Sequence, residues 1–516
     1  MQGESRVQKS QRNLIASLIN NVVITILGFA TRTVFVHSLG TDYLGLNGLF
    51  TNVLSLLSLA ELGVGSAITF SLYKPIAENN QNKIRALMGL YKRAYIIIGS
   101  VILFAGLAIM PFLKYIVNLD TGIEINYYAI YFMFLFNSVI SYWFFAYRSV
   151  IIYANQDGFL LTREETIFAL IKAISQFAVL FIFRNYYIYL AIPIVVGIIK
   201  NIIISGIAKK RYPYINGQIT VPLTKSEKKG IFENVFALSL FKISSVVYSS
   251  TDNIIISTWL GTKIVGVLSN YTMITQLVSS YINMFFQSMY ASIGNLNASE
   301  SVEYKFTVFR RLDLLNYWIY TYCAICLGCF LNPCIFVWLG ADYCLSSSTV
   351  ILIALTFYIP GLNNVINIYK DACGLFKQVQ LRALATAIVN LVVSIILVFR
   401  IGINGVFIGT VVAYLSTIYL VDPRVVFSNV FKKPKSMYYL PLIKKILLFS
   451  VIFVASFHVV SSFSITRWYE LIIAFIVLSI ILNLFFLLIY HKKEEFIYFK
   501  DLSKKALTNL HSRFFH

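Results

Sequence analysis

Residues 36–58, VHSLGTDYLGLNGLFTNVLSLLS, are similar to residues 257–279, STWLGTKIVGVLSNYTMITQLVS, which lie 221 positions further along the chain. The seven identical positions include the pattern Leu-Gly-Thr-x-x-x-Gly, which begins at Leu39 in the first copy and at Leu260 in the second. Each copy lies between two long apolar stretches, so the pattern is typical of a tight turn between two helices. A repeat with this spacing predicts a chain built from two similar halves.

The composition places these halves in a membrane. Of the 516 residues, 58% are hydrophobic and 13% are charged, which is about half the charged fraction of a soluble protein. This balance excludes a soluble enzyme, a secreted disulfide scaffold and a disordered chain. We expect an all-α polytopic membrane protein with fourteen transmembrane helices. The expected spans are 15–36, 44–68, 94–112, 127–150, 166–183, 186–206, 235–259, 264–290, 312–338, 349–369, 379–399, 402–421, 441–460 and 470–490.

The basic residues orient these spans. Lys and Arg number 43 against 22 Asp and Glu, a net charge of +21. With both termini in the cytoplasm, 36 of the 43 fall in cytoplasmic segments or at the helix ends beside them. This bias follows the positive-inside rule and needs no nucleic acid partner to explain it. Only Arg32 and Lys242 lie within spans and are not explained by the topology.

The spans predict two pseudo-equivalent six-helix bundles followed by two further helices. The two repeat copies follow the first and the seventh span, so both halves cross the membrane in the same direction. The expected parts are an N-terminal lobe at 13–207, a basic cytoplasmic linker at 208–229, a C-terminal lobe at 230–422, two helices within 441–490 and a cytoplasmic tail at 491–516.

Polar side chains recur at helical spacing in the first two spans of each half. Such side chains usually face the bundle or a wet cavity. In span 349–369, Asn367 follows Pro360, which predicts a kinked helix. We therefore expect an aqueous cavity lined by Asn47, Thr51, Ser249, Gln276, Asn283 and Asn367. The alternative is that these groups only make hydrogen bonds between packed helices.

The charged residues of the spans are the candidate functional groups. Fixed cations suit an anionic substrate, because Arg and Lys bind phosphate. The candidate substrate-binding residues are Arg32, Lys242, Asn21 and Arg148, and the candidate ion-coupling or gate residues are Asp252 and Glu61. One hypothesis pairs Arg32 with Asp252 at the outer mouth. The alternatives are a local packing hydrogen bond for Asp252 and a topological role for Arg148.

The remaining motifs do not indicate chemistry. Cys323, Cys326 and Cys329 have the spacing of an iron–sulfur ligand set, but they lie in an apolar span without a polar shell. Nucleotide-binding loops, nucleophile elbows and zinc-protease motifs are missing from the sequence. We therefore expect no catalytic residue, no metal and no cofactor, and a protein that is not an enzyme.

Three stretches carry a resemblance to a known family. They are Phe35–Pro75 (FVHSLGTDYLGLNGLFTNVLSLLSLAELGVGSAITFSLYKP), Thr251–Tyr271 (TDNIIISTWLGTKIVGVLSNY) and residues 402–414 (GINGVFIGTVVAY). The chain resembles the Wzx-type polysaccharide flippases, which translocate O-antigen or capsule repeat units. They form a branch of the multidrug/oligosaccharidyl-lipid/polysaccharide exporter (MOP) superfamily.

The resemblance implies a flippase of the bacterial inner membrane that works by alternating access. It would move an undecaprenyl-diphosphate-linked oligosaccharide to the outer leaflet for O-antigen, capsule or exopolysaccharide assembly. The implied partners are membrane lipids, a proton or sodium gradient, and polymerase and chain-length proteins. The last two spans would help to hold the lipid tail.

Three other functions stay open. A lipid II flippase would carry another undecaprenyl substrate. A drug/cation antiporter of the same superfamily would have a mainly acidic cavity, whereas Glu61 and Asp252 are balanced here by two cations. A membrane polysaccharide polymerase would need a large outer loop, and the longest expected one, at about 113–126, has few reactive side chains.

Overall fold

The computed structural model describes residues 6–61, 64–118, 125–155, 157–217, 222–287, 300–375 and 377–501, with 289, 293, 294, 296, 297 and 504. Some side chains inside helices lie outside this description, including those of 6–15 and 236–249. All regular secondary structure within the described ranges is helical.

Ten of the described helices are long and apolar enough to cross a membrane, and an eleventh span consists of Tyr127–Trp143 and Ala146–Ala154, bent by 42°. These eleven match eleven of the expected spans. Helices Lys225–Leu260 and Thr262–Gln287 lie over the expected spans 235–259 and 264–290, but they do not meet the same criterion over the described residues. Over the expected span 44–68, the α-helix ends at Leu57, a 3-10 helix follows at Ser58–Glu61, and the next α-helix begins at Val64. The all-helical polytopic architecture is confirmed.

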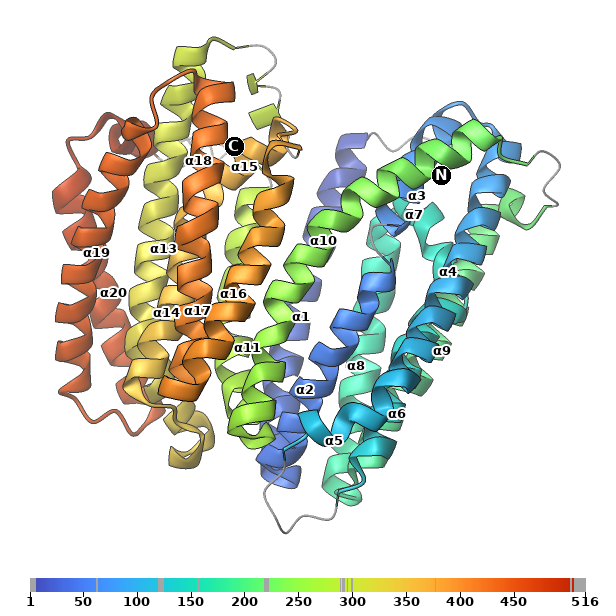
Figure 1. Cartoon of the computed structure of the whole chain (residues 1–516), viewed down its shortest axis with the longest axis horizontal. Coiled ribbons are helices and arrows are strands. Elements are labelled where there is room, and N and C mark those ends of the chain that lie inside the picture. Colours follow the sequence, from blue (N-terminus) through green and yellow to red (C-terminus); the bar gives the residue numbers. More distant parts are fainter. Residues whose placement is uncertain are drawn as a thin grey trace, which may run out of the picture. The chain divides into compact units, whose positions relative to one another are not determined.

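By its internal contacts the chain divides into Met1–Ser269 and Asn270–His516. The division falls after α10 and not in the basic segment 208–229, because α10 packs on α2 and α3. The expected lobe boundaries stay a prediction. The helices of the first unit, shown in Figure 1, are α1 (Arg6–Leu39), α2 (Thr41–Leu57), η1 (Ser58–Glu61), α3 (Val64–Ala77), α4 (Gln81–Ile109), α5 (Leu113–Ile116), α6 (Tyr127–Trp143), η3 (Ala146–Arg148), α7 (Ser149–Ala154), α8 (Gly158–Ile182), α9 (Tyr186–Arg211) and α10 (Lys225–Leu260).

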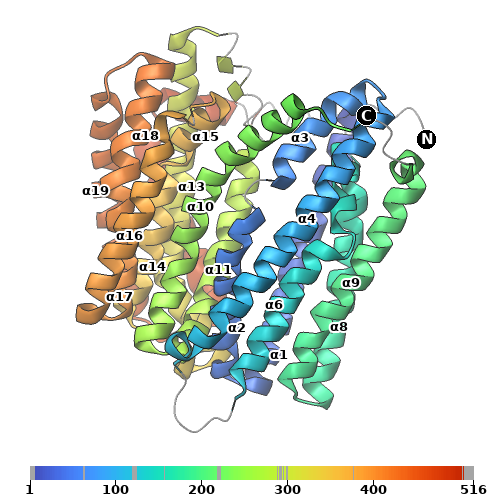
Figure 2. The ribbon, with the colours of Figure 1, turned by 45° about the vertical axis from the view of Figure 1, so that its right-hand side comes forward.

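In the second unit, α13 is the central helix and packs on α14, α19 and α20. Figure 2 shows α13, α14 and α19 side by side from a second direction. The described helices are α11 (Thr262–Gln287, which begins in the first unit), α13 (Val302–Leu339), α14 (Ser347–Leu362), α15 (Asn364–Ala372), α16 (Gln380–Ile401), α17 (Ile403–Ala413), α18 (Tyr419–Val426), α19 (Ser436–Ser461) and α20 (Trp468–Tyr490).

The span that contains Pro360 is interrupted at Asn363, between α14 and α15. A break inside a membrane leaves carbonyl groups without helical partners, and another group must satisfy them. The buried amide of Asn316 does so, because its Nδ2 donates to the carbonyls of Gly361 (2.9 Å) and Leu362 (3.4 Å). The kink expected from Pro360 and the asparagines is therefore present, and a side chain of α13 stabilises it.

The aqueous end of α10 is fixed by local hydrogen bonds. Thr224 and Glu227 form a capping box, in which each side chain accepts from the other residue's backbone N–H. Lys83 on α4 lies 2.7 Å from the Glu227 carboxylate. The hydrogen bond from Lys83 and those from Thr224 lower the pKa of Glu227 to about 2. This cluster ties the start of α10 to α4.

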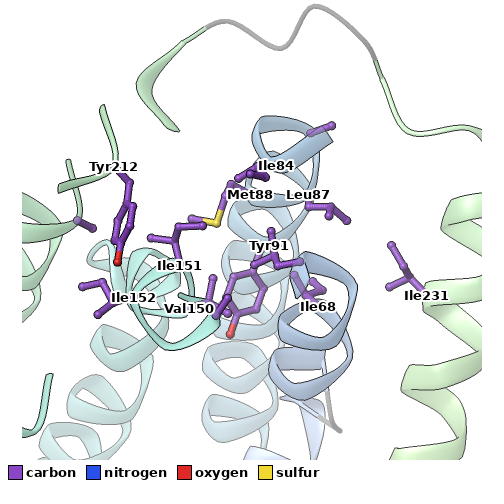
Figure 3. Close-up of a cluster of buried hydrophobic side chains, with 14 of the residues drawn as sticks. Ile68, Ile84, Leu87, Met88, Tyr91, Val150, Ile151, Ile152, Tyr212 and Ile231 are labelled. Atoms are coloured by element: carbon purple, nitrogen blue, oxygen red, sulfur yellow. The ribbon is translucent and has the colours of Figure 1, made fainter. Parts of the chain in front are cut away.

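An apolar cluster packs α3, α4, α7, α9 and α10 of the first unit together (Figure 3). Ile68, Leu87 and Ile151 are almost fully buried in it. Tyr91 belongs to the same cluster, with its ring buried and its hydroxyl at the edge of the cluster toward a polar group described below. The cluster therefore holds one polar side chain of the first unit in a fixed position.

Each of the two repeat turns depends on a glycine. Gly40 joins α1 to α2 with φ +85°, and Gly261 joins α10 to α11 with φ +102°. Positive φ values of this kind are strained for residues with a side chain, which explains why both copies have glycine here. The expected tight turns between helices are confirmed at both positions.

The two repeat copies also interlock within the first unit. A Cβ atom on Gly45 would collide with the backbone of Thr262, and a Cβ on Gly266 would lie 2.5 Å from the carbonyl oxygen of Thr41. These contacts are reciprocal, because Gly266 and Thr262 are the repeat equivalents of Gly45 and Thr41. The glycines of the Leu-Gly-Thr-x-x-x-Gly pattern therefore allow α2 and α11 to approach backbone to backbone.

We expect Gly266→Ala to lower the thermal unfolding midpoint of the detergent-solubilised protein. The added methyl group would collide with the backbone of Thr41 and Gly45 and push α2 away from α11. Such overpacking costs about 1–3 kcal/mol of stability. Gly206→Ala in α9 is the matched control, because a Cβ there has no neighbour within 4 Å. Helix propensity predicts that the control is neutral or slightly stabilising. Equal midpoints for the two variants would contradict the interlock.

Candidate functional site

The first unit contains a carboxylate surrounded by tyrosines, which we call the Glu61 site. It consists of Glu61, Tyr91, Tyr95 and Tyr142. The hydroxyl of Tyr142 donates to Oε2 of Glu61 at 3.1 Å, and the hydroxyl of Tyr91 donates to that of Tyr95 at 2.7 Å. The ring centroids lie 4.4 Å apart for Tyr91 and Tyr95, and 5.4 Å apart for Tyr95 and Tyr142. The site therefore combines one half-buried carboxylate with several phenol groups.

Four helical segments, η1, α3, α4 and α6, position this site. Glu61 is the last residue of η1, a 3-10 helix that directly follows α2. Gly65 leaves room for the site, because a Cβ there would lie 3.0 Å from the Tyr91 hydroxyl and 3.4 Å from Oε1 of Glu61. Tyr142 lies in the last turn of α6, directly before the bend of that span. The 3-10 turn of η1 and the bend after α6 therefore meet at one carboxylate. Interrupted helices are used by membrane transporters at ion and substrate sites.

The Glu61 site offers groups that can contact a cation. The carboxylate supplies a negative charge for a metal cation or an organic cation. The aromatic faces beside it favour cations further. Sequence reasoning identified Glu61, but it missed the three tyrosines, since the chain has 34 tyrosines and their spacing does not distinguish these.

Arg32 lies beside the interlocked repeat turns and not in the Glu61 site. Its guanidinium donates to the hydroxyl of Ser269, which donates in turn to the carbonyl of Gly266 at 2.6 Å. The described contacts therefore connect α1 to the start of α11. The proposed pairing of Arg32 with the half-buried Asp252 stays a prediction.

Arg148 lies just after the bend that carries Tyr142. Its Nη1 donates to the buried hydroxyl of Ser205 on α9 at 2.6 Å, and its guanidinium lies 5.1 Å from the ring centroid of Phe145. Phe145 has φ +58°, which is part of the bend itself. Arg148 therefore ties the bend to α9, and it is half-buried.

The remaining candidates of the first unit differ in their exposure. Asn21 and Asn47 are half-buried, whereas Thr51 is exposed and donates to the carbonyl of Asn47 at 2.7 Å. The side chains of Lys242 and Ser249 on α10 lie outside the described residues. Their expected roles stay predictions.

In the second unit, Gln276 and Asn283 on α11 are exposed. Asn367 is half-buried and accepts from Nζ of Lys370 at 3.0 Å. Its described partner is therefore a cation of the same helix.

Lys370 belongs to a buried ion cluster that sequence reasoning missed. Asp422 on α18 has no exposed surface. Its carboxylate forms ion pairs with Nζ of Lys370 at 3.3 Å and with Nε of Arg382 at 3.1 Å. Asp371 lies 3.7 Å from Lys370. The cluster ties α15, α16 and α18 together. A carboxylate just outside the expected span 402–421 gives no signal of burial in the sequence.

The first unit has a similar pair of an arginine and an aspartate. It lies in the hairpin of α8 and α9, which corresponds to the hairpin of α16 with α17 and α18 in the second unit. Asp157, at the start of α8, accepts from Arg211 and from Tyr212 at the end of α9, both at 2.7 Å. In the second unit the arginine comes first, because Arg382 lies near the start of α16 and Asp422 lies in α18. Both hairpins therefore close with an Arg–Asp pair, but with the charges exchanged.

The cysteines are consistent with apolar packing. Cys326 and Cys329 are buried, and all six cysteines have free thiols. Over the part of the chain that the structure describes, no group of three or more His, Cys, Asp or Glu side chains could hold a metal ion.

Solved transporters share this fold. A Vibrio cholerae MATE transporter, VcmN, matches with a TM-score of 0.56 and 14% identity over 83% of this chain and 98% of its own. An inward-facing multidrug resistance MATE family transporter of the MOP superfamily has a TM-score of 0.59 and 15% identity over 80% of this chain and 98% of its own. An outward-facing multidrug resistance MATE family transporter matches with a TM-score of 0.54 and 16% identity, over 83% of this chain and 97% of its own.

The sequence comparisons add nothing to this, because no family model and no curated protein matches the chain. At these identities the structural likeness shows the fold, which is that of MATE transporters. The expected all-helical membrane fold is confirmed, whereas membership of the MOP superfamily and of its Wzx-type branch stays a prediction. The MATE structures are covered almost completely, whereas about a fifth of this chain lies outside each match.

We expect Asp422→Asn to destabilise the protein strongly. The change keeps the side-chain volume but leaves Lys370 and Arg382, whose side chains are 9% and 11% exposed, without their shared carboxylate. Breaking a buried ion pair in this way costs about 3–5 kcal/mol. The measurement is the thermal unfolding midpoint in detergent. Asp342→Asn, at an exposed aspartate, is the control, and a midpoint shared by both variants would show that the cluster contributes little.

Proposed function

We propose that the chain is a secondary transporter that works by alternating access and binds its coupling ion at Glu61. The observation that carries this proposal is the Glu61 site, in which a carboxylate meets three tyrosines beside the bend that follows α6. Uptake and release of a proton or a sodium ion there would change the charge of the site. A change of this kind can bias a two-state transporter between its conformations.

For the substrate, we propose an organic cation as the first candidate. The fold is that of proteins described as multidrug resistance MATE transporters. A carboxylate with aromatic neighbours also suits a cation, which would be exchanged against the coupling ion at the same site. This drug/cation antiporter has more support from the fold neighbours than the flippase expected from the sequence resemblance.

A lipid-linked oligosaccharide is the second candidate, and Arg32 favours it. An arginine within a membrane span suits the diphosphate of an undecaprenyl-linked substrate. The proposed partners in that case are the polymerase and chain-length proteins of surface polysaccharide assembly. The protein would lie in the bacterial inner membrane with both termini in the cytoplasm. A lipid II flippase would use the same cations.

We expect Glu61→Gln to abolish gradient-driven transport of a fluorescent organic cation in proteoliposomes. Glutamine keeps the shape of the side chain but can neither take up a proton nor neutralise a cation. Glu303→Gln, at an exposed position on α13, is the control and should transport as the unmodified protein does. Tyr142→Phe removes one hydrogen bond of about 1 kcal/mol and should weaken cation binding several-fold. Unchanged transport by Glu61→Gln at equal protein levels would refute its coupling role.

The flippase candidate makes a different prediction. The double variant Arg32→Gln and Lys242→Gln should lose surface polysaccharide while its transport of organic cations persists, because only an anionic substrate needs these cations. Lys225→Gln with Lys228→Gln removes the same charge from exposed residues at the start of α10 and is the control. Surface polysaccharide is measured by blotting cells at matched protein levels, and normal polymer in the first double variant would rule out the cation role.

A further inference from the structure

A pocket of about 690 Å³ lies in the second unit, between α13, α19 and α20. It involves the first turns of α19 and the end of α20, together with the stretch of α13 around Phe309 and Leu314. Helix ends of membrane spans lie at the level of lipid head groups. The volume is in the range of pockets that hold a sizeable small molecule. The pocket therefore opens where the head and the upper chain of a lipid would lie.

The charged lining of the pocket is mainly basic. Its charged side chains are Arg310, Asp313, Lys444, Lys445, Lys493 and Glu495. Lys445 lies 2.6 Å from the carboxylate of Asp313, and Arg310 forms an ion pair with Glu495. Both carboxylates are therefore already neutralised from within the pocket.

Lys444 and Lys493 supply the remaining charge. Among the described residues, neither ammonium group has a carboxylate within ion-pair distance, and both side chains are exposed. They approach the same pocket from different helix ends, since Lys444 lies near the start of α19 and Lys493 follows α20. Two positive charges thus face a pocket in which all negative charges are paired, which suits a ligand with an anionic group.

The rest of the lining is apolar and aromatic. Phe306, Leu440, Leu448 and Ile489 are among these side chains, and Pro441 and Tyr490 border the pocket as well. A free phosphate ion would gain nothing from such walls, whereas the acyl chains of a lipid would bury apolar surface against them. Anionic lipids are also attracted to basic residues at the cytoplasmic surface, and the charge distribution of the sequence predicts that this end is cytoplasmic.

We propose that this pocket binds an anionic phospholipid, with its phosphate group between Lys444 and Lys493 and its chains along α19 and α20. The lipid would join the two C-terminal helices to α13. The site is separate from Glu61, which belongs to the other unit. The two proposals can therefore fail independently.

Native mass spectrometry of the purified full-length protein tests this site. Phosphatidylglycerol is titrated against the protein in detergent, with zwitterionic phosphatidylcholine as the comparison lipid. We expect one phosphatidylglycerol to bind more tightly than any phosphatidylcholine. In Lys444→Gln with Lys493→Gln, its affinity should fall roughly thirtyfold, as two lost surface charges would predict.

The matched control is Lys435→Gln with Lys492→Gln. It removes the same charge from exposed residues beside the same helix ends, but neither side chain lines the pocket. The control should keep the tight phosphatidylglycerol. Equal losses in both double variants, or equal binding of the two lipids to the unmodified protein, would overturn the proposal.

A competition arm separates the phospholipid from the proposed transport substrate. Undecaprenyl diphosphate is added to the protein loaded with phosphatidylglycerol. Retention of the phospholipid supports the proposal, whereas its displacement at equimolar competitor would assign the pocket to the polyprenyl lipid and overturn it. Size-exclusion profiles of all variants establish that they are folded.

Discussion

In a membrane span every backbone polar group needs a partner within the protein, and this constraint determines where the chain can depart from a regular helix. The helix can be interrupted at Asn363 because the side-chain amide of Asn316 donates hydrogen bonds to the carbonyls of Gly361 and Leu362. At the bend after α6, the neighbouring side chains Tyr142 and Arg148 bind Glu61 and Ser205. At both of these places polar side chains of neighbouring helices accompany the departure from a regular helix.

Buried carboxylates are under a related constraint, because an unpaired charge away from water is costly. Asp157 and Asp422 are almost fully buried, and each is held by an arginine of a neighbouring helix end. For Glu61 the structure describes a hydrogen bond from the hydroxyl of Tyr142. The proposed coupling role of Glu61 rests on this carboxylate and on the aromatic rings around it.

Much of the fold could be predicted from the sequence, since hydropathy located eleven of the spans and the repeat located the two glycine turns. The bend after α6 could not, because Trp143–Ala146 contains neither proline nor glycine. For the site, Glu61 stood out as a carboxylate in an apolar segment, whereas its tyrosine partners come from distant helices and only the fold brings them together. Polar stripes were a weaker guide, since Gln276 and Asn283 are exposed.

The exchanged charges of the two hairpins bear on how a chain with two similar halves assembles correctly. Duplicated helices could pair with the wrong half during folding, which is a common failure of repetitive proteins. If α8 met α18, Asp157 would face Asp422, and if α16 met α9, Arg382 would face Arg211. Each wrong pairing brings together like charges, and for the two aspartates these charges would be buried. Electrostatic repulsion therefore favours the pairing of each half with its own helices.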